Sequence, residues 1–540
     1  MYRQNHTNRQ ETLIDISAWM DKRTLKKLNE SWAPIFYNEV FKKIDEEPFS
    51  VLYSETGAPN FPVNILLSLE YIKYMKHYND LDLLEGYDFD YLINYAVGNK
   101  TLGEKPLSER TLYNFRSRVY KYSMDNPGSD GILYGQFINL LGNFAEKSHI
   151  SMKEQRMDTT MFMSNIKRAG RLTLAYDMLV KAVKAIPEDM RTDALAAALK
   201  PEFKTDTLYR TKPDGNSSKL DQLMALCKET YEILKGIPEA AETTVNMRRF
   251  LKEQSEVDIN GRTRAKSKYA IRADSIQSAF DTDATYHKKS GAGQSGYVME
   301  LSETCADENP YNLLTDCRVE KNIVSDVKII ADRIAVINDN TGCENMYVDG
   351  GFNSVSASNA AEAAGVELHM TNMSGTRPTE KMPAEVYEID EETNRILKCP
   401  EGATPIHASI TGSQTVAHFD KNICEQCEMY GRCHAKLQKN SAVLRISLKS
   451  VRTGRERTKM ISERVGNTSK RAAIEGSNSA MKRTGLRKLK VRGQEKCGVV
   501  ALFMATSQNI KRFINYKLNR YDAAIRKKKE RIGQDLPSFT

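Results

Sequence analysis

The sequence predicts an α/β protein in which a core of strands and helices is interrupted by inserted segments. After about residue 150, short runs rich in Thr, Val, Tyr and Phe alternate with helical periodicity, an order typical of a sheet flanked by helices. Two stretches do not fit this core: residues 165–270 have a helical pattern throughout, and residues 395–440 are irregular and contain clustered cysteines. A chain of 540 residues is too long for one ordinary core and predicts about two to four domains.

Residues 1–150 have the pattern of a separate helical domain. In FPVNILLSLEYIKYMK, Pro62 stands where the first residue of a helix is favoured, and apolar residues follow at helical spacing. In LSERTLYNFRSRV, Ser108 is the predicted N-cap. The predicted apolar face of that second helix consists of Leu112, Phe115 and Val119.

The predicted core occupies residues 151–510. The run QRMDTTMFM is rich in Thr, Phe and Met and lacks Gly and Pro, so it predicts a strand. Three further apolar runs predict strands, and VKIIADRIAVI predicts a helix. We expect helices from about Lys470 and a basic tail over residues 511–540. The predicted strands are residues 155–163, residues 295–301, a segment near Val319 and residues 345–349.

Composition and charge restrict the class of protein. Hydrophobic residues make up 40% and charged residues 28%, as in folded proteins, and the formal net charge is +9. This excess alone fits nucleic acid, an acidic partner or no partner. Basic residues crowd the segment from Arg452 to Lys496, which surrounds a candidate catalytic residue, and there we favour DNA. The shorter RKKKER cluster at 526–531 is more typical of a solvated surface.

The sequence has no segment typical of export or membrane insertion. The N-terminus, MYRQNHTNRQ, lacks the apolar stretch of a signal peptide, and no apolar run approaches the roughly 20 residues of a membrane helix. The nine cysteines are an odd number, and a reducing compartment argues against a disulfide framework. We therefore expect a cytoplasmic protein.

Two aspartates lie at strand positions suited to chemistry. Asp349 ends an apolar strand and precedes Gly350, which places it in an open crevice, although a turn aspartate fits the same pattern. Asp158 lies in mid-strand, where a carboxylate needs a cation or an exposed sheet edge. Asp281 and Asp283 compete with Asp158 as metal ligands.

Glu475 lies in a predicted helix, SKRAAIEGSNSAMKRTG. Arg471 is four residues earlier and Lys482 seven residues later, so all three are expected on one helical face. Ion pairing on a surface helix would give the same pattern, but Gly476 is a poor residue for a purely structural helix.

Three carboxylates in one site have a clear chemical use. Hard oxygen ligands select Mg²⁺ or Mn²⁺, and two such ions about 3.5–4 Å apart activate an attacking oxygen and stabilise a leaving oxygen in phosphodiester displacement. Basic residues around the site would hold the phosphates. The predicted catalytic and metal-binding residues are Asp158, Asp349 and Glu475, with two Mg²⁺ (or Mn²⁺) as cofactors.

These stretches together resemble the DDE transposases of bacterial insertion sequences. FPVNILLSLEY…LSERTLYNFRSRV resembles the N-terminal domain of that family, RMDTTMFMSN its first catalytic strand, YVDGGFNS the strand end with the second Asp, RAAIEGSNSAMKRTGLRKLKVRG its catalytic helix and NIKRF its closing helix. The family signature is Tyr, two residues, Arg, three residues, Glu, six residues, Lys. Arg471, Glu475 and Lys482 match it, whereas Thr468 stands at the Tyr position, so no tyrosine hydroxyl is present there.

The resemblance implies a fold and an activity. It implies an RNase H-like mixed sheet flanked by helices, a DNA-binding domain over residues 1–150, and cleavage at element ends followed by strand transfer into target DNA. A homodimer would bind the terminal inverted repeats, in the bacterial cytoplasm at the nucleoid. The predicted DNA contacts are Arg471, Lys482, Arg483, Arg487, Lys488 and Arg116. Two alternatives remain: a zinc-containing DNA-binding repressor derived from a transposase, and a stand-alone RNase H-like nuclease.

The irregular segment contains four clustered cysteines. Cys424-x-x-Cys427 has the spacing of a metal-binding pair, and Cys399 and Cys433 would complete a tetrahedral site for structural Zn²⁺. His434 would replace an absent cysteine, and an iron–sulfur cluster or free thiols remain alternatives. A similar cluster in a subgroup of the family resembles a structural knuckle. The other five cysteines are expected to be buried apolar residues.

Overall fold

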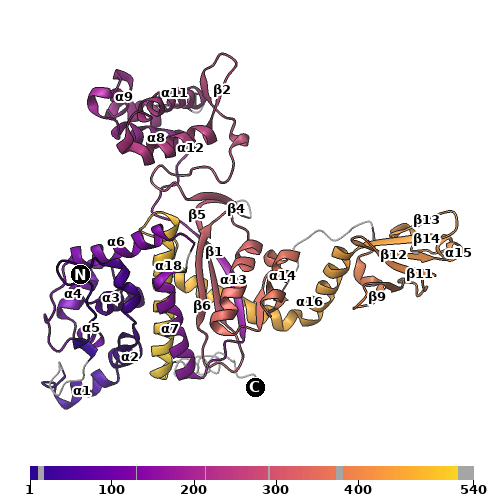
Figure 1. Ribbon diagram of the computed structural model, residues 1–540, viewed down its shortest axis with the longest axis horizontal. Helices are drawn as coiled ribbons and strands as arrows, with labels where there is room; N and C mark the ends of the chain where they lie inside the picture. Colours follow the sequence, from indigo (N-terminus) through magenta and orange to yellow (C-terminus); the bar gives the residue numbers. More distant parts are fainter. Residues whose placement is uncertain (10–16, 129, 213–214, 290–291, 372–380, 521–540) are drawn as a thin grey trace, which may run out of the picture. The chain divides into compact units, whose positions relative to one another are not determined.

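The computed structural model of this 540-residue chain describes residues 1–9, 17–128, 130–212, 215–289, 292–371 and 381–520. The chain divides into two compact units. The first unit contains Met1–Ile329, Asp339–Gly342 and Ile474–Thr540, and the second contains Ile330–Asn338 and Cys343–Ala473. Both units contain helices and strands (Figure 1), which confirms the predicted α/β class.

The first unit begins with a group of helices, as the sequence predicts. Helix α6 (Glu109–Asp125) starts where expected, because the hydroxyl of Ser108 accepts a hydrogen bond from the backbone N–H of Thr111 over 3.2 Å. The predicted apolar face of α6 is buried: Leu112, Phe115 and Val119. The neighbouring helices are α1 (Lys22–Asn29), α2 (Trp32–Glu39), α3 (Val63–Lys76), α4 (Asp80–Phe89), α5 (Tyr91–Ala96) and α7 (Gly131–Ser148).

Strand β5 (Ala292–Thr304) is central to the sheet of the first unit. It pairs antiparallel with β1 (Glu154–Phe162), so that Asp158 lies opposite Leu301. It also pairs with β6 (Leu314–Lys321) and, through its first residues, with β4 (Thr285–Lys289). The predicted strands at 155–163, at 295–301 and near Val319 are therefore confirmed. Part of the glycine-rich run, residues 290–291, lies outside the described residues.

Helix α18 (Gln494–Lys517) is the buried helix of the first unit. It packs against β6 and against α3, α6 and α7, and the apolar run VVALFMAT is buried in these contacts. The predicted boundary at residue 510 falls inside α18, because its apolar face continues through Phe513 and Ile514. Residues 521–540, which include the RKKKER cluster, lie outside the described residues. Among the helices that the structure describes, none has the length and apolar composition needed to span a membrane.

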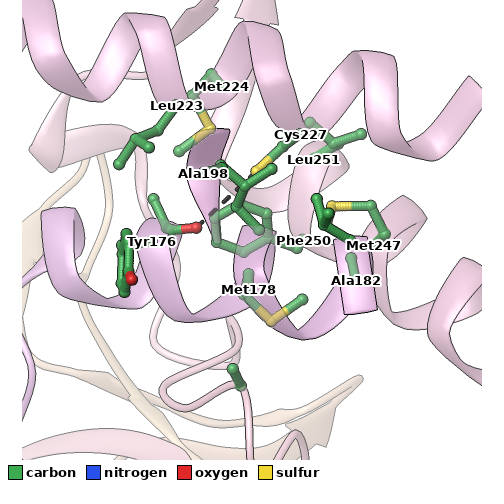
Figure 2. Packing of buried hydrophobic residues seen from close by; sticks show 14 of the residues in the cluster. Tyr176, Met178, Ala182, Ala198, Leu223, Met224, Cys227, Met247, Phe250 and Leu251 are labelled. Carbon is green, nitrogen blue, oxygen red and sulfur yellow. Dashed lines mark hydrogen bonds between the residues drawn. The ribbon is translucent and has the colours of Figure 1, made fainter. Parts of the chain in front are cut away.

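The predicted helical insertion has a core of its own. It contains α8 (Arg171–Lys184), α9 (Asp193–Ala198), α10 (Pro201–Leu208), α11 (Asn216–Leu234) and α12 (Ala241–Gln254), followed by a hairpin of β2 (Ser255–Val257) and β3 (Thr263–Ala265). Figure 2 shows the apolar side chains that these helices direct toward one another, among them Phe250, Met224 and Cys227.

Arg171, the first residue of α8, joins the two ends of this insertion. Its Nε donates to Oε1 of Gln254 over 3.0 Å, and its Nη1 donates to the carbonyl of Lys266 over 2.8 Å. Its Nη2 donates to the carbonyl of Gln254 over 3.1 Å. One side chain thus connects the start of the insertion with residues about 80 to 95 positions later.

The second unit contains a parallel strand pair and a small sheet. β7 (Asn345–Val348) pairs parallel with β8 (Glu367–Met370), which confirms the predicted strand at 345–349, and α14 (Val355–Ala363) connects them. Helix α13 (Asp326–Thr341), also predicted, precedes β7 and contributes to both units.

The cysteine segment is more ordered than its sequence predicts. Strands β11 (His407–Thr411), β12 (Gln414–Phe419), β14 (Ala442–Ser447) and β13 (Ala435–Leu437) form a sheet in that order. β9 (Glu388–Ile389) pairs with β10 (Ile396–Lys398), and α15 (Lys421–Glu425) follows β12. These strands escaped prediction because β13 has only three residues, and because consecutive buried residues in β12 replace the usual alternation. Helix α16 (Leu448–Ala472) then begins earlier than the expected Lys470.

Candidate active site and cysteine cluster

Strand β1 and helix α17 (Ile474–Met481) bring a predicted catalytic aspartate beside the predicted catalytic helix. Nδ2 of Asn478 on α17 donates a hydrogen bond to Oδ2 of Asp158 over 3.1 Å, across 320 positions of the sequence. α17 packs against β1 and β5 because its buried residues recur at helical spacing. The buried residues of α17 are Ile474, Ser477, Asn478 and Met481.

Glu475 lies in the first turn of α17 and is exposed beside that buried face. Residues three apart on an α-helix are neighbours, so Glu475 borders Asn478, whose amide contacts Asp158. Two of the three predicted catalytic carboxylates therefore lie on packed, adjacent elements of the first unit. Asn478 was not anticipated from the sequence, because one asparagine in a helix carries no signal of a partner 320 residues away.

A buried ionic cluster fixes α17 against the sheet. Glu303 of β5 is only 1% exposed, and it accepts hydrogen bonds from Nε of Arg156 over 2.8 Å and from Nη1 of Arg512 over 3.0 Å. The hydroxyl of Ser477 donates to the same carboxylate and accepts from Nη2 of Arg512 over 2.6 Å. Burial by itself would raise the pKa of Glu303, but Arg512 and Arg156 hold it below its usual range. The carboxylate is therefore charged, and it ties together β1, β5, α17 and α18.

The second unit places Asp349 beside Arg471. Asp349 follows β7, where its carboxylate accepts from the backbone N–H of Gly351 over 2.8 Å and caps a short 3₁₀ turn. Nη2 of Arg471, at the end of α16, lies 3.5 Å from Oδ2 of Asp349. His369 of β8 supports this arrangement, because its ring nitrogens lie 2.8 Å from Oδ1 of Asn345 on β7 and 3.2 Å from Oε2 of Glu463 on α16.

The catalytic helix expected from the sequence is divided in two. α16 ends at Ala472, Ala473 has ψ of −18°, closer to a 3₁₀ turn, and α17 begins at Ile474. Lys482 lies beyond α17 in a π-helical turn that ends in a kink, where Gly485 adopts φ of 116°. The helix is interrupted at Ala473, and the face shared by Arg471, Glu475 and Lys482 stays a prediction.

The basic segment after α17 runs along the end of β1. The backbone N–H of Met163 donates to the carbonyl of Arg487 over 3.2 Å, and that of Leu489 donates to the carbonyl of Met163 over 2.9 Å. This backbone pairing leaves the cationic side chains on the outside. Lys482 is half-buried, and the exposed cations of the segment include Arg483, Arg487 and Lys488.

Arg116 does not have the environment expected of a DNA contact. It is buried on α6, where Nε donates to Glu70 over 2.6 Å and the two Nη atoms donate to Asp80 over 2.9 and 2.7 Å. Burial alone would raise the pKa of Asp80, but Arg116 and Lys73 hold it well below its usual range. The guanidinium is committed to these two carboxylates, so its geometry supports a structural role in the helical domain.

Asp281 and Asp283, which compete with Asp158 as predicted metal ligands, lie in environments that differ from that of Asp158. Asp281 is buried and accepts hydrogen bonds from the hydroxyl of Ser164 and, over 2.7 Å, from the hydroxyl of Tyr297. Burial and the neighbouring Asp281 raise the pKa of Tyr297, which keeps that hydroxyl a donor. Asp283 is exposed. Asp281 thus satisfies two interior hydroxyl groups, which favours Asp158 as the ligand.

The four clustered cysteines line one small cavity in the second unit. The cavity has a volume of about 30 Å³, room for one atom-sized occupant. Burial raises the pKa of the Cys424 thiol, and the neighbouring cysteines raise it further. Among the residues described here, no group of three or more His, Cys, Asp or Glu is placed so that it could hold a metal ion. The cavity-lining thiols are Cys399, Cys424, Cys427 and Cys433.

Two family models match the chain at the parts just described. A transposase domain model matches residues 22–118, within the N-terminal helices, and a transposase DDE domain model matches residues 398–514, from the cysteine segment to α18. The two matches support a DDE-type transposase of the insertion-sequence type. Searches of curated proteins and of solved structures found no match. Transposase domains imply DNA binding in general, and a DDE domain implies the use of divalent metal ions.

The matches bear unequally on the predicted site of this transposase. The DDE match contains Arg471, Glu475 and Lys482, whereas Asp158 and Asp349 lie outside it. The assignment of all three carboxylates stays a prediction. The sequence also held an unused signal: β5 contains two glutamates, Glu300 and Glu303, and a carboxylate buried in a strand requires polar or cationic partners.

Proposed function

We propose that this transposase cleaves DNA at the ends of its element and joins the freed ends to target DNA, using two Mg²⁺ held by Asp158, Asp349 and Glu475. The observation that carries the proposal is the hydrogen bond from Asn478 to Asp158, which links the first aspartate to the helix that bears Glu475. In the other unit, Asp349 lies at a strand end beside Arg471, the signature arginine.

The chemistry of these donors suits Mg²⁺. Carboxylate oxygens are its preferred ligands, and Mg²⁺ usually takes only one or two carboxylates and completes its shell with water and substrate phosphates. When bound, the ions would polarise the scissile phosphate and favour the charged attacking and leaving oxygens. Asn478 would keep the carboxylate of Asp158 in position for this role.

The proposed reaction has two steps at this site. A water oxygen attacks the phosphorus at the element end, and the bond to the bridging O3′ breaks, which leaves a 3′-hydroxyl and a 5′-phosphate. That 3′-hydroxyl then attacks a target phosphorus and displaces the target's own O3′. The exposed cations Arg483, Arg487 and Lys488 would hold the phosphates on either side. Two copies of the chain would bring the two ends together.

The cysteine cluster would hold a structural Zn²⁺. Four sulfurs around a cavity of about 30 Å³ match the ligand type and number of closed zinc sites. A bound cation would stabilise thiolates that otherwise repel one another, and it would hold the small sheet β11–β14 to the loops that carry Cys399 and Cys433. This role is structural and separate from the carboxylates.

Cleavage of element-end DNA tests the proposal. Purified protein, a duplex carrying the inverted repeat that flanks the gene, and Mg²⁺ should yield nicked ends and then products joined to a target plasmid. Asp158→Asn, Asp349→Asn and Glu475→Gln should each reduce both products to background, whereas the matched control Asp283→Asn should cut as the parent does. Unaltered cutting by Asp349→Asn would disprove the assignment. Cut ends that never join would indicate a nuclease, and binding without cutting would indicate a repressor.

A further inference from the structure

The hairpin that closes the helical insertion has a rigid tip. β2 and β3 are joined by residues 258–262, and Oδ1 of Asp258 accepts from the backbone N–H groups of Asn260 and Arg262, each over 2.9 Å. The hydrogen bond from Arg262 holds the pKa of Asp258 below its usual range. Gly261 takes φ of 76°, which this tight turn requires. The tip is therefore held by its own hydrogen bonds and by the ion pair of Asp258 with Nε of Arg264, 2.8 Å away.

The two faces of β3 differ in character. Ala265 packs against the apolar core of the insertion, and its backbone N–H donates to Oδ1 of Asp221 on α11 over 2.8 Å. Because side chains alternate across a strand, Arg262 and Arg264 lie on the opposite, exposed face. Lys268 and Arg272 continue the exposed cations beyond the strand.

This surface has more cations than anions and carries exposed apolar groups. Residues 255–274 include five Lys and Arg residues and three acidic residues, and two of the cations are paired: Nε of Arg264 lies 2.8 Å from Asp258, and Nη2 of Arg272 lies 2.8 Å from Asp274. Ile259 at the tip is fully exposed, Val257 is 68% exposed and Tyr269 is 87% exposed, with Nζ of Lys268 at 4.9 Å from the tyrosine ring centre. Apolar side chains this open, among cations, are costly in water and suit a partner that is both anionic and grooved.

We propose that the β2–β3 hairpin binds duplex DNA, with its ribbon in a groove and its cations on the flanking phosphates. A two-stranded ribbon fits the major groove, which is about 12 Å wide. Arg262 and Lys268 contact the phosphates, and Ile259 contacts the base edges. The inference rests on the proposed function, because it names an additional DNA contact of the same enzyme, outside the carboxylate site and outside both matched domains.

The salt dependence of DNA binding tests this surface directly. Each phosphate contact contributes about 0.9 to the slope of log affinity against log salt, so the double variant Arg262→Ala/Lys268→Ala should lower that slope by about 2. The probe is a fluorescein-labelled random-sequence duplex, measured by anisotropy between about 50 and 200 mM salt without Mg²⁺, so that no cleavage occurs. Ile259→Ala should weaken binding several-fold and leave the slope unchanged.

The matched control removes the same charge from another face of the insertion. Lys228→Ala/Lys235→Ala deletes two exposed cations of the α11 end, which pair with Glu232, and should leave the slope as in the parent. Equal slopes for the hairpin variant and this control, with unchanged thermal unfolding, would overturn the inference. Failure of the proposed function would look different: the parent would bind DNA with the hairpin-dependent slope and yet cut nothing in Mg²⁺.

Discussion

Replacing Glu303 by glutamine removes one charge from the interior of the first unit and leaves its shape unchanged. In the parent, this 1% exposed carboxylate faces Arg156 and Arg512 and accepts from Ser477 of α17. The variant leaves two largely buried guanidinium groups without their anion. Removing one partner of a buried ion pair costs about 3–5 kcal/mol, so we expect the free energy of unfolding of this unit to fall by about that amount.

The matched control for Glu303 is Glu232, which also pairs with two cations but lies on the surface of α11. Glu232→Gln should have the same urea midpoint as the parent, whereas Glu303→Gln should have a clearly lower one. The backbone amide hydrogens of α17 should also exchange faster in Glu303→Gln. Because the pKa of Glu303 is lowered in the folded protein, its stabilisation is complete above the ordinary glutamate pKa of about 4.3 and is lost as pH falls through the lower folded value. The difference between parent and variant should therefore be full at neutral pH and shrink in acid. Equal urea midpoints for Glu303→Gln and Glu232→Gln would refute the reasoning.

Two further changes test the other assignments. Arg116→Ala should destabilise the N-terminal helices by about 3–5 kcal/mol, because Glu70 and Asp80 lose their cation. The slope of log DNA affinity against log salt should equal that of the variant Arg110→Ala, which removes an exposed arginine of the same helix. A lower slope for Arg116→Ala would restore Arg116 as a DNA contact. Cys427→Ser, or treatment with a strong chelator, should release zinc and lower the thermal stability of the cysteine segment, whereas Cys305→Ser should keep the metal; protein purified from zinc-containing medium without stoichiometric zinc would exclude the site.

The parts of the fold that the sequence could predict are those with strong local patterns. The N-cap at Ser108 and the apolar face of α6 follow from rules within one helix, and β1 and β7 follow from short apolar runs. The small sheet β11–β14 could not be predicted because its strands are short and are fixed by cross-strand pairing. The hairpin after α12 was missed because it follows a long helical stretch and its strands have three residues each.

For the candidate site, sequence reasoning identified residue types but not partners. Glu475 and Arg471 stand at recognisable spacing, yet only the folded chain shows that Arg471 contacts Asp349 and that Asn478 contacts Asp158. Arg116 illustrates the opposite error: a cation on a helix predicted DNA, and burial beside Glu70 reversed that interpretation. Such contacts span tens to hundreds of positions, and no local pattern encodes them.

The clamp made by Arg171 has a consequence for how this chain tolerates so large an insertion. One guanidinium joins the first helix of the insertion to Gln254 and Lys266. The two chain segments that connect the insertion to the sheet therefore begin close together. Closing a loop costs entropy that grows only with the logarithm of its length, and here the insertion's own core offsets that cost. To the strands on either side, a stretch of about a hundred residues behaves like a short turn, so it can change in length or sequence without altering the register of β1 with β5.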